Sequence, residues 1–125
     1  MNLILIAVGG ALGALARYGI AGVVQSRAGF FPWGTLAVNV LGSFLLGFGF
    51  RYMEAVAIPA EWRQAVTVGF LGAFTTFSTF SFETIALAQD GDWKRAATYL
   101  SVSILLGLAA VVAGLGLAGS SLRAR

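Results

Sequence analysis

The chain of 125 residues has the length of a single domain, and apolar residues make up 58% of it. Charged residues are only 10%, where a soluble domain carries about 25%, so the composition excludes an ordinary soluble protein. The chain has no cysteine and no histidine, which excludes thiolate chemistry, a disulfide framework and a structural zinc site. Its eight Lys and Arg residues are scattered, so the net charge of +3 indicates anionic lipid rather than nucleic acid as a partner.

Four stretches with little or no charge are each long enough to cross a bilayer, whose core needs about 20 apolar residues per helix. We predict one all-α integral membrane domain, residues 1–125, with spans at about residues 2–25, 32–52, 63–87 and 95–119. The three tryptophans fall where spans meet loops, as in an aromatic belt. The first span is not expected to be a cleaved signal peptide, because it lacks a basic leading region.

The basic residues are divided almost evenly between the two ends of the predicted spans. Four lie at one end and three at the other: Arg51, Arg63, Arg123 and Arg125 against Arg27, Lys94 and Arg95. Such a division gives little preference for either orientation in the membrane. Either the translocon or the lipids fix the topology of a weakly biased chain, or chains insert both ways and pair antiparallel. The second alternative also fits the small subunit, since four packed helices fill their own centre with side chains.

Polar residues inside the first two spans are candidates for function, because such groups usually face the bundle interior or a water-filled route. In span one, Arg17 follows the Gly9–Gly13 spacing and either snorkels to the interface or attracts anions at a helix seam. In span two, Asn39 and Ser43 are four residues apart and share a helix face. Asn39 either makes an interhelical hydrogen bond or donates its amide N–H to a passing anion.

Span three is the segment least suited to a continuous helix, because the hydroxyls of residues 69–81 compete for backbone hydrogen bonds. We predict a break near Gly72–Thr76, where freed carbonyls could bind a small cation. The alternative is an intact helix with hydroxyls bonded to the preceding turn. Phe77 and Phe80 share a face, with Ser81 beside them. This pair is either ordinary packing or presents positive ring edges that attract an anion weakly.

Span four places Tyr99, Ser103 and Gly107 at steps of four, which predicts a second polar stripe along one helix face. Glu83 is the acidic residue closest to span three, and we expect its carboxylate to be solvated or anchored at the interface. The spans contain no deep pair of carboxylates for proton coupling and no nucleophile with a base. The chain is therefore not expected to be an enzyme.

Three segments together resemble a known family: GGALGALARY at 9–18, GTLAVNVLGSFLLG at 34–47 and GFLGAFTTFSTFS at 69–81. They are similar to the Fluc/CrcB fluoride-channel family, over three of the four spans. The resemblance implies a passive, fluoride-selective channel that is multi-pass in a prokaryotic plasma (inner) membrane and confers fluoride resistance. It also implies an antiparallel, dual-topology homodimer with two pores, so that the partners are fluoride, a second copy of the chain and bilayer lipid.

The resemblance further implies roles for individual residues. A structural Na⁺ would lie at the dimer centre, held by the backbone carbonyls of Gly72 and Thr75. The fluoride pathway would contain Asn39, Phe77, Phe80, Ser81, Tyr99 and Ser103. Arg17 would lie near the vestibule. Gly107 stands where the stripe of span four is expected to carry a further hydroxyl.

Two other classes of membrane protein have a similar size. A small four-helix proton-coupled multidrug exporter also forms antiparallel dimers, but its coupling glutamate in the first span is absent here, where Arg17 is the charged residue. A non-conducting membrane assembly subunit would explain the small-residue seams. It would not explain the TTFST segment or an amide as deep in a span as Asn39.

Overall fold

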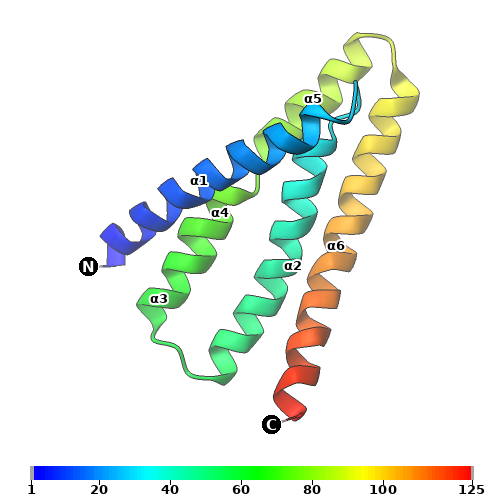
Figure 1. Cartoon of the computed structure of the whole chain (residues 1–125). Coiled ribbons are helices and arrows are strands. Elements are labelled where there is room, and N and C mark those ends of the chain that lie inside the picture. The colour runs from blue at the N-terminus through cyan, green and yellow to red at the C-terminus, as the bar shows by residue number, and fades with distance from the viewer. Residues whose placement is uncertain (1, 125) are drawn as a thin grey trace.

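The computed structural model describes residues 2–124, and four helical segments run between the two ends of the molecule (Figure 1). Their bounds are α1 (Asn2–Ser26), α2 (Trp33–Ala55), a composite third segment (Ala60–Gln89) and α6 (Trp93–Arg123). Each segment is long and apolar enough to cross a membrane, which confirms the prediction of an all-α chain with four spans. Arg125, counted above among the basic residues, lies outside the described residues.

The third segment consists of four pieces. They are α3 (Ala60–Gln64), the π-helical η1 (Ala65–Leu71), α4 (Gly72–Phe74) and α5 (Phe77–Gln89). The segment begins directly after Pro59, earlier than the predicted residue 63. Proline is tolerated at a helix start, because the N–H that it lacks would have no partner within the helix.

Close backbone contacts set how the helices pack. α2 and α6 lie side by side and run in the same direction, whereas α1 crosses the third segment (Figure 1). Where α1 meets η1, a Cβ added at Gly13 would overlap the carbonyl oxygen of Phe70, and one added at Gly9 would overlap that of Ala65. The Gly9–Gly13 spacing therefore permits the close approach of two membrane helices.

Replacing Gly13 with alanine is expected to destabilise the subunit by about 1–3 kcal/mol, because the added methyl group overpacks a backbone contact. The matched control is Gly19→Ala on the same helix, where an added Cβ would have no heavy atom within 4 Å. Thermal unfolding of both purified variants in detergent checks the prediction. Equal melting temperatures for Gly13→Ala and Gly19→Ala would show that this crossing is not tight.

The loop between α1 and α2 is held by a single side chain. The Nε2 of Gln25 donates to the carbonyl oxygens of Gly29 (2.7 Å) and Phe31 (3.1 Å). Its Oε1 accepts from the backbone N–H of Gly34 at 3.1 Å, which satisfies a donor at the start of α2 that has no helical acceptor. Gln25 therefore fixes where α2 begins relative to α1.

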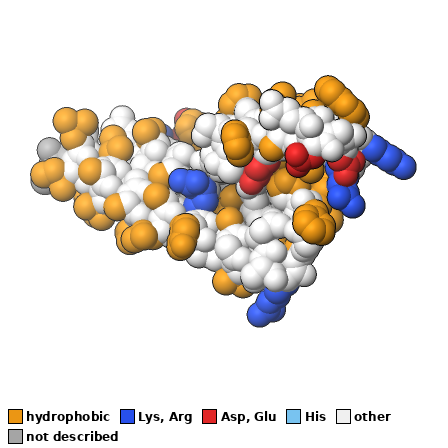
Figure 2. Space-filling model, turned by 90° about the horizontal axis from the view of Figure 1, so that it is seen from above, with side chains coloured by type: hydrophobic (Ala, Val, Ile, Leu, Met, Phe, Trp, Pro, Cys, Tyr) orange, Lys and Arg blue, Asp and Glu red, His pale blue; other side chains and the backbone are white. Residues whose placement is uncertain are grey.

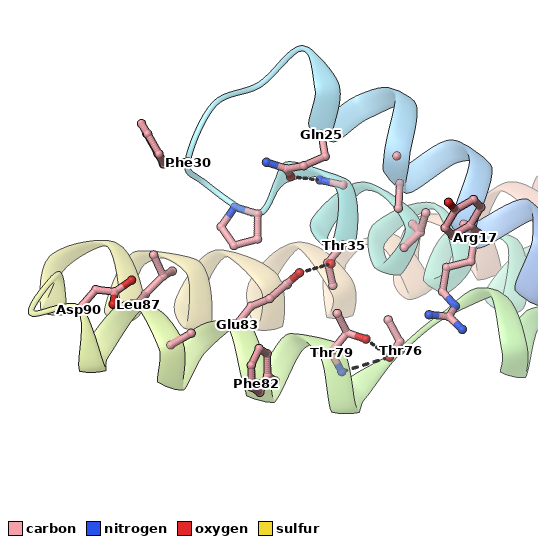
Figure 3. Close-up of a pocket in the computed structure, with 17 residues that line it drawn as sticks. Arg17, Gln25, Phe30, Thr35, Thr76, Thr79, Phe82, Glu83, Leu87 and Asp90 are labelled. Carbon is pink, nitrogen blue, oxygen red and sulfur yellow. Dashed lines mark hydrogen bonds between the residues drawn. The ribbon is translucent and has the colours of Figure 1, made fainter.

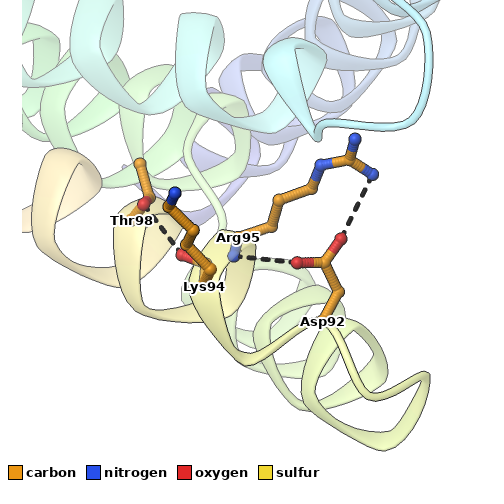
Figure 4. Close-up of polar contacts among 4 residues, drawn as sticks. All are labelled: Asp92, Lys94, Arg95 and Thr98. Carbon is orange, nitrogen blue, oxygen red and sulfur yellow. Dashed lines mark hydrogen bonds and ion pairs between the residues drawn. The ribbon is translucent and has the colours of Figure 1, made fainter.

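The turn between α5 and α6 is fixed by Asp92 (Figure 4). Its Oδ1 accepts from the backbone N–H of Arg95 at 3.1 Å and caps α6, while its Oδ2 lies 3.2 Å from the Arg95 guanidinium. An exposed ion pair adds little stability, so the cap is the larger contribution. This turn places Lys94 and Arg95 together at one end of the molecule.

Large hydrophobic side chains are exposed along all four segments, and Figure 2 shows them over much of the surface seen from one end. Trp33, Trp62 and Trp93 are 47%, 52% and 71% exposed at the ends of their helices. Apolar patches of this extent on a monomer mark contact with lipid or with another protein. The chain is thus a multi-pass membrane protein whose buried core is small.

Candidate functional site

The third segment is interrupted between α4 and α5. α4 ends at Phe74, and Thr75 and Thr76 have extended backbone conformations, with ψ of 157° and 113°. The Oγ1 of Thr76 then accepts from the backbone N–H of Thr79 at 3.2 Å and caps α5. Threonine is a favourable N-cap residue, so the local sequence stabilises a new helix start at this point.

Asn39 of α2 pairs with the interrupted backbone. Its Nδ2 donates to the carbonyl oxygen of Thr76 at 3.0 Å, and its Oδ1 accepts from the Thr76 N–H at 2.8 Å. The interhelical hydrogen bond considered for Asn39 is therefore present, but it is made to backbone. A primary amide carries two N–H donors, so one donor of Asn39 is left for another acceptor.

Arg17 of α1 also binds the backbone beside the interruption. Its Nε donates to the carbonyl oxygen of Ala73 at 2.9 Å. The contact is partly buried and joins residues 56 positions apart, so Arg17 does not simply snorkel to the nearer interface. A positive charge is thereby held next to the interrupted segment.

The carbonyl groups of residues 72–75 lose their helical donors at the interruption, and two of them are those of Gly72 and Thr75. In a continuous helix the N–H of Thr76 would bond to Gly72, and the N–H of Thr79 would bond to Thr75. Here those two N–H groups bond to Asn39 Oδ1 and Thr76 Oγ1. Among residues 2–124, no group donates to the carbonyl oxygen of Gly72 or of Thr75. The family resemblance implied a cation at these two carbonyls, and that role stays a prediction.

Two open hollows flank the interruption. The first, of about 580 Å³, extends from Arg17 and Thr76 at one end to Leu87 and Asp90 at the other (Figure 3). The second, of about 270 Å³, is lined by both polar and apolar residues of α2 and the third segment, including Asn39, Ser43, Gly72, Thr75 and Phe77. Thr76 lines both hollows, so the interruption lies between them.

Glu83 faces the first hollow, where it accepts two hydrogen bonds. The Thr35 hydroxyl donates to Oε1 at 2.8 Å, and the Tyr99 hydroxyl donates to Oε2 at 2.6 Å (Figure 3 shows the first). The expectation of a merely solvated or interface-anchored carboxylate was wrong, because α5 turns Glu83 toward α2 and α6. Glu83 lies three residues after Phe80, which is buried, so the two side chains share the helix face that points inward. That spacing is the feature of the sequence from which the inward position of Glu83 could have been predicted.

The other predicted pathway residues are not gathered at one place in a single subunit. Phe77 is 79% exposed, whereas Phe80 is 7% exposed and packs against Tyr99 with ring centroids 5.2 Å apart. Ser81 donates back to the Phe77 carbonyl oxygen at 2.9 Å, and the Ser103 Oγ is buried without a partner among the described residues. Phe80, Ser81, Tyr99 and Ser103 line neither of the two hollows.

Known proteins are similar to this chain over most of its length. The family model for CrcB-like proteins, described as camphor resistance (CrcB), matches residues 4–115. The chain belongs to the CrcB-like family. A protein of Hahella chejuensis is 51% identical over 118 residues, 93% of each chain. One of Nitratidesulfovibrio vulgaris is 47% identical over 117 residues, and one of Thermus thermophilus is 48% identical over 118.

These relatives are similar along nearly their whole length. The match covers 92% of this chain and 94% of the Nitratidesulfovibrio protein, and 94% of both chains for the Thermus protein. All three are named fluoride-specific ion channel FluC. The CrcB-like match includes Arg17, Asn39, the interruption at Thr75 and Thr76, and Glu83. The site described above therefore lies within the region that defines the family.

Proposed function

We propose that this CrcB-like protein is a fluoride-selective channel that lets fluoride leave a prokaryotic cell passively through the plasma membrane. The observation that carries the proposal is the near 50% identity, over more than nine-tenths of each chain, to proteins named fluoride-specific ion channels. Such a channel, rather than an enzyme, would confer resistance by expelling fluoride that enters the cell as HF.

The chemistry around the interruption supports a pathway for a small anion. Fluoride is strongly hydrated, and moving an ion of this kind into a medium of low dielectric costs on the order of 20 kcal/mol unless donors replace the water. Asn39 has an unused amide N–H beside the exposed ring of Phe77 in the second hollow. Neutral donors suit conduction, because a permeant ion must bind weakly enough to leave.

Two antiparallel copies would complete the pathway. The hollows of one subunit are open at its surface, and Phe77 is largely exposed beside the second. The nearly even division of basic residues permits insertion in both orientations. Ser81 lines neither hollow in one subunit and would join the pathway only with the second copy in place. Phe80, Tyr99 and the Ser103 Oγ are buried within the subunit, so their predicted contact with fluoride would also require the helices around them to separate.

The interruption also fits a structural Na⁺. The carbonyl oxygens of Gly72 and Thr75 lack donors, and uncharged oxygens are ligands suited to a small cation. The resemblance to the fluoride-channel family is what singles out these two carbonyls as the candidate ligands. When bound, the ion would offset the partial negative charges of carbonyls from both subunits. The neighbouring carbonyl oxygens of Thr76 and Ala73 already accept hydrogen bonds, from Asn39 and Arg17 respectively.

Purified protein in liposomes loaded with fluoride is expected to release it rapidly when the potential is collapsed, without any proton gradient. A fluoride electrode measures the release, and chloride-loaded liposomes provide the comparison because larger halides should be retained. Release that requires a proton gradient would instead indicate a coupled exporter. No release from protein that remains folded would indicate a non-conducting assembly subunit and overturn the channel.

A further inference from the structure

One hydroxyl in the middle of α2 has an unusual environment. Hydroxyls within these helices commonly donate to the carbonyl four residues earlier, as Thr67, Thr84 and Thr98 do. Ser43 makes no such bond and has no hydrogen-bond partner among the described residues. An unpaired polar group within a membrane span carries a free-energy cost, so a partner absent from the single subunit is expected.

Ser43 faces the place where the pathway is proposed. It lies one helical turn after Asn39 and lines the same hollow, together with Thr75 and Phe77. Its side chain is half-buried, so its hydroxyl is reachable from the hollow without being open to lipid on all sides.

The neighbouring helix leaves room at this level. A Cβ added at Gly107 of α6 would lie 3.8 Å from the Ser43 Oγ, an ordinary contact distance. α6 thus contributes only backbone where α2 contributes a hydroxyl. One turn earlier on α6, Ser103 has a buried Oγ that also lacks a partner among residues 2–124. Two unpaired hydroxyls therefore lie within about one turn of each other at the seam of α2 and α6.

We propose that Ser43 is a further pathway residue, whose hydroxyl donates to fluoride at the level of Gly107. The inference rests on the proposed channel function and adds one contact to it, the hydrogen bond from the Ser43 hydroxyl to fluoride. Asn39 and Ser43 would then present neutral donors at successive turns of α2. An ion leaving the amide of Asn39 would meet the next donor about 6 Å along the helix, the rise of four residues. Successive weak sites of this kind are what conduction requires.

Moving the hydroxyl from α2 to α6 tests the proposal. Ser43→Ala is expected to slow fluoride efflux from liposomes by about tenfold, the effect of losing one hydrogen bond to a charged group. Combining Ser43→Ala with Gly107→Ser should restore most of the rate, because the new hydroxyl occupies the free space beside residue 43. The matched control combines Ser43→Ala with Gly107→Ala, which adds the carbon without the oxygen and should stay slow.

The outcomes separate this proposal from the channel function itself. Wild-type protein that conducts, with Ser43→Ala conducting equally fast, would overturn the role of Ser43 alone. Rescue by Gly107→Ala as complete as by Gly107→Ser would also overturn it, because packing rather than a donor would then explain the loss. Wild-type protein that passes no fluoride would overturn both proposals. Elution volume in detergent verifies that each variant is folded.

Discussion

Replacing Asn39 with aspartate is expected to reduce fluoride efflux by at least about tenfold. Aspartate lacks the N–H that binds the Thr76 carbonyl oxygen, and it sets a carboxylate oxygen against that carbonyl. Leaving a buried acceptor unpaired costs about 1–3 kcal/mol, which loosens the interruption. A negative charge in the hollow would also repel the permeant anion, more strongly than in water because the surroundings have a lower dielectric constant.

A second substitution separates the two effects. Asn39→Leu has a similar volume and no charge, but it loses both bonds to Thr76. If fluoride passes close to residue 39, Asn39→Asp should be slower than Asn39→Leu, since only the former adds repulsion. Gln89→Glu makes the same amide-to-acid change at the exposed end of α5 and should conduct like wild type. Unchanged efflux for Asn39→Asp would remove Asn39 from the pathway.

The four spans could be predicted from the sequence because they depend on hydropathy, which is a property of each stretch by itself. Long uncharged stretches mark the helices, and the loops carry Gly29, Pro59 and Gly91, two of which have positive φ values. The end of the last span was placed at residue 119, whereas α6 continues to Arg123. No breaker separates these positions, so hydropathy alone could not fix where the helix frays.

The contacts of the site could be predicted only in part, because they join residues far apart in the chain. Sequence indicates that Asn39 needs a partner, but not that the partner is the backbone of Thr76, 37 residues away. The same holds for Glu83, whose two donors come from Thr35 and Tyr99 on different helices. Which polar residues meet depends on how the helices cross, and glycine contacts such as Gly13 with Phe70 determine that crossing.

Single cysteines at opposite ends of the molecule are expected to be labelled from outside the cell in about equal proportion. The chain has no native cysteine, so each introduced thiol is unique. Gln89→Cys at the end of α5 and Ala60→Cys at the start of α3 are exposed and leave the basic residues unchanged (Figure 1). With four basic residues against three, about half of each variant should react with a membrane-impermeant maleimide. Permeabilised cells give the full-labelling reference.

Shifting the charge balance should then abolish efflux from proteoliposomes unless an oppositely biased partner is supplied. Arg27→Gln with Lys94→Gln leaves one basic residue at that end against four at the other, which favours a single orientation. Subunits that all face the same way cannot pair antiparallel, so the doubly substituted protein should be inactive alone. Coexpression with a variant carrying Arg51→Gln, Arg63→Gln and Arg123→Gln, which leaves one basic residue at their end against three at the other, should restore conduction by supplying inverted partners. If the biased variant is labelled on one side only and still conducts as fast as wild type, the antiparallel pairing is wrong, and the pathway must be completed within one subunit or by a parallel arrangement.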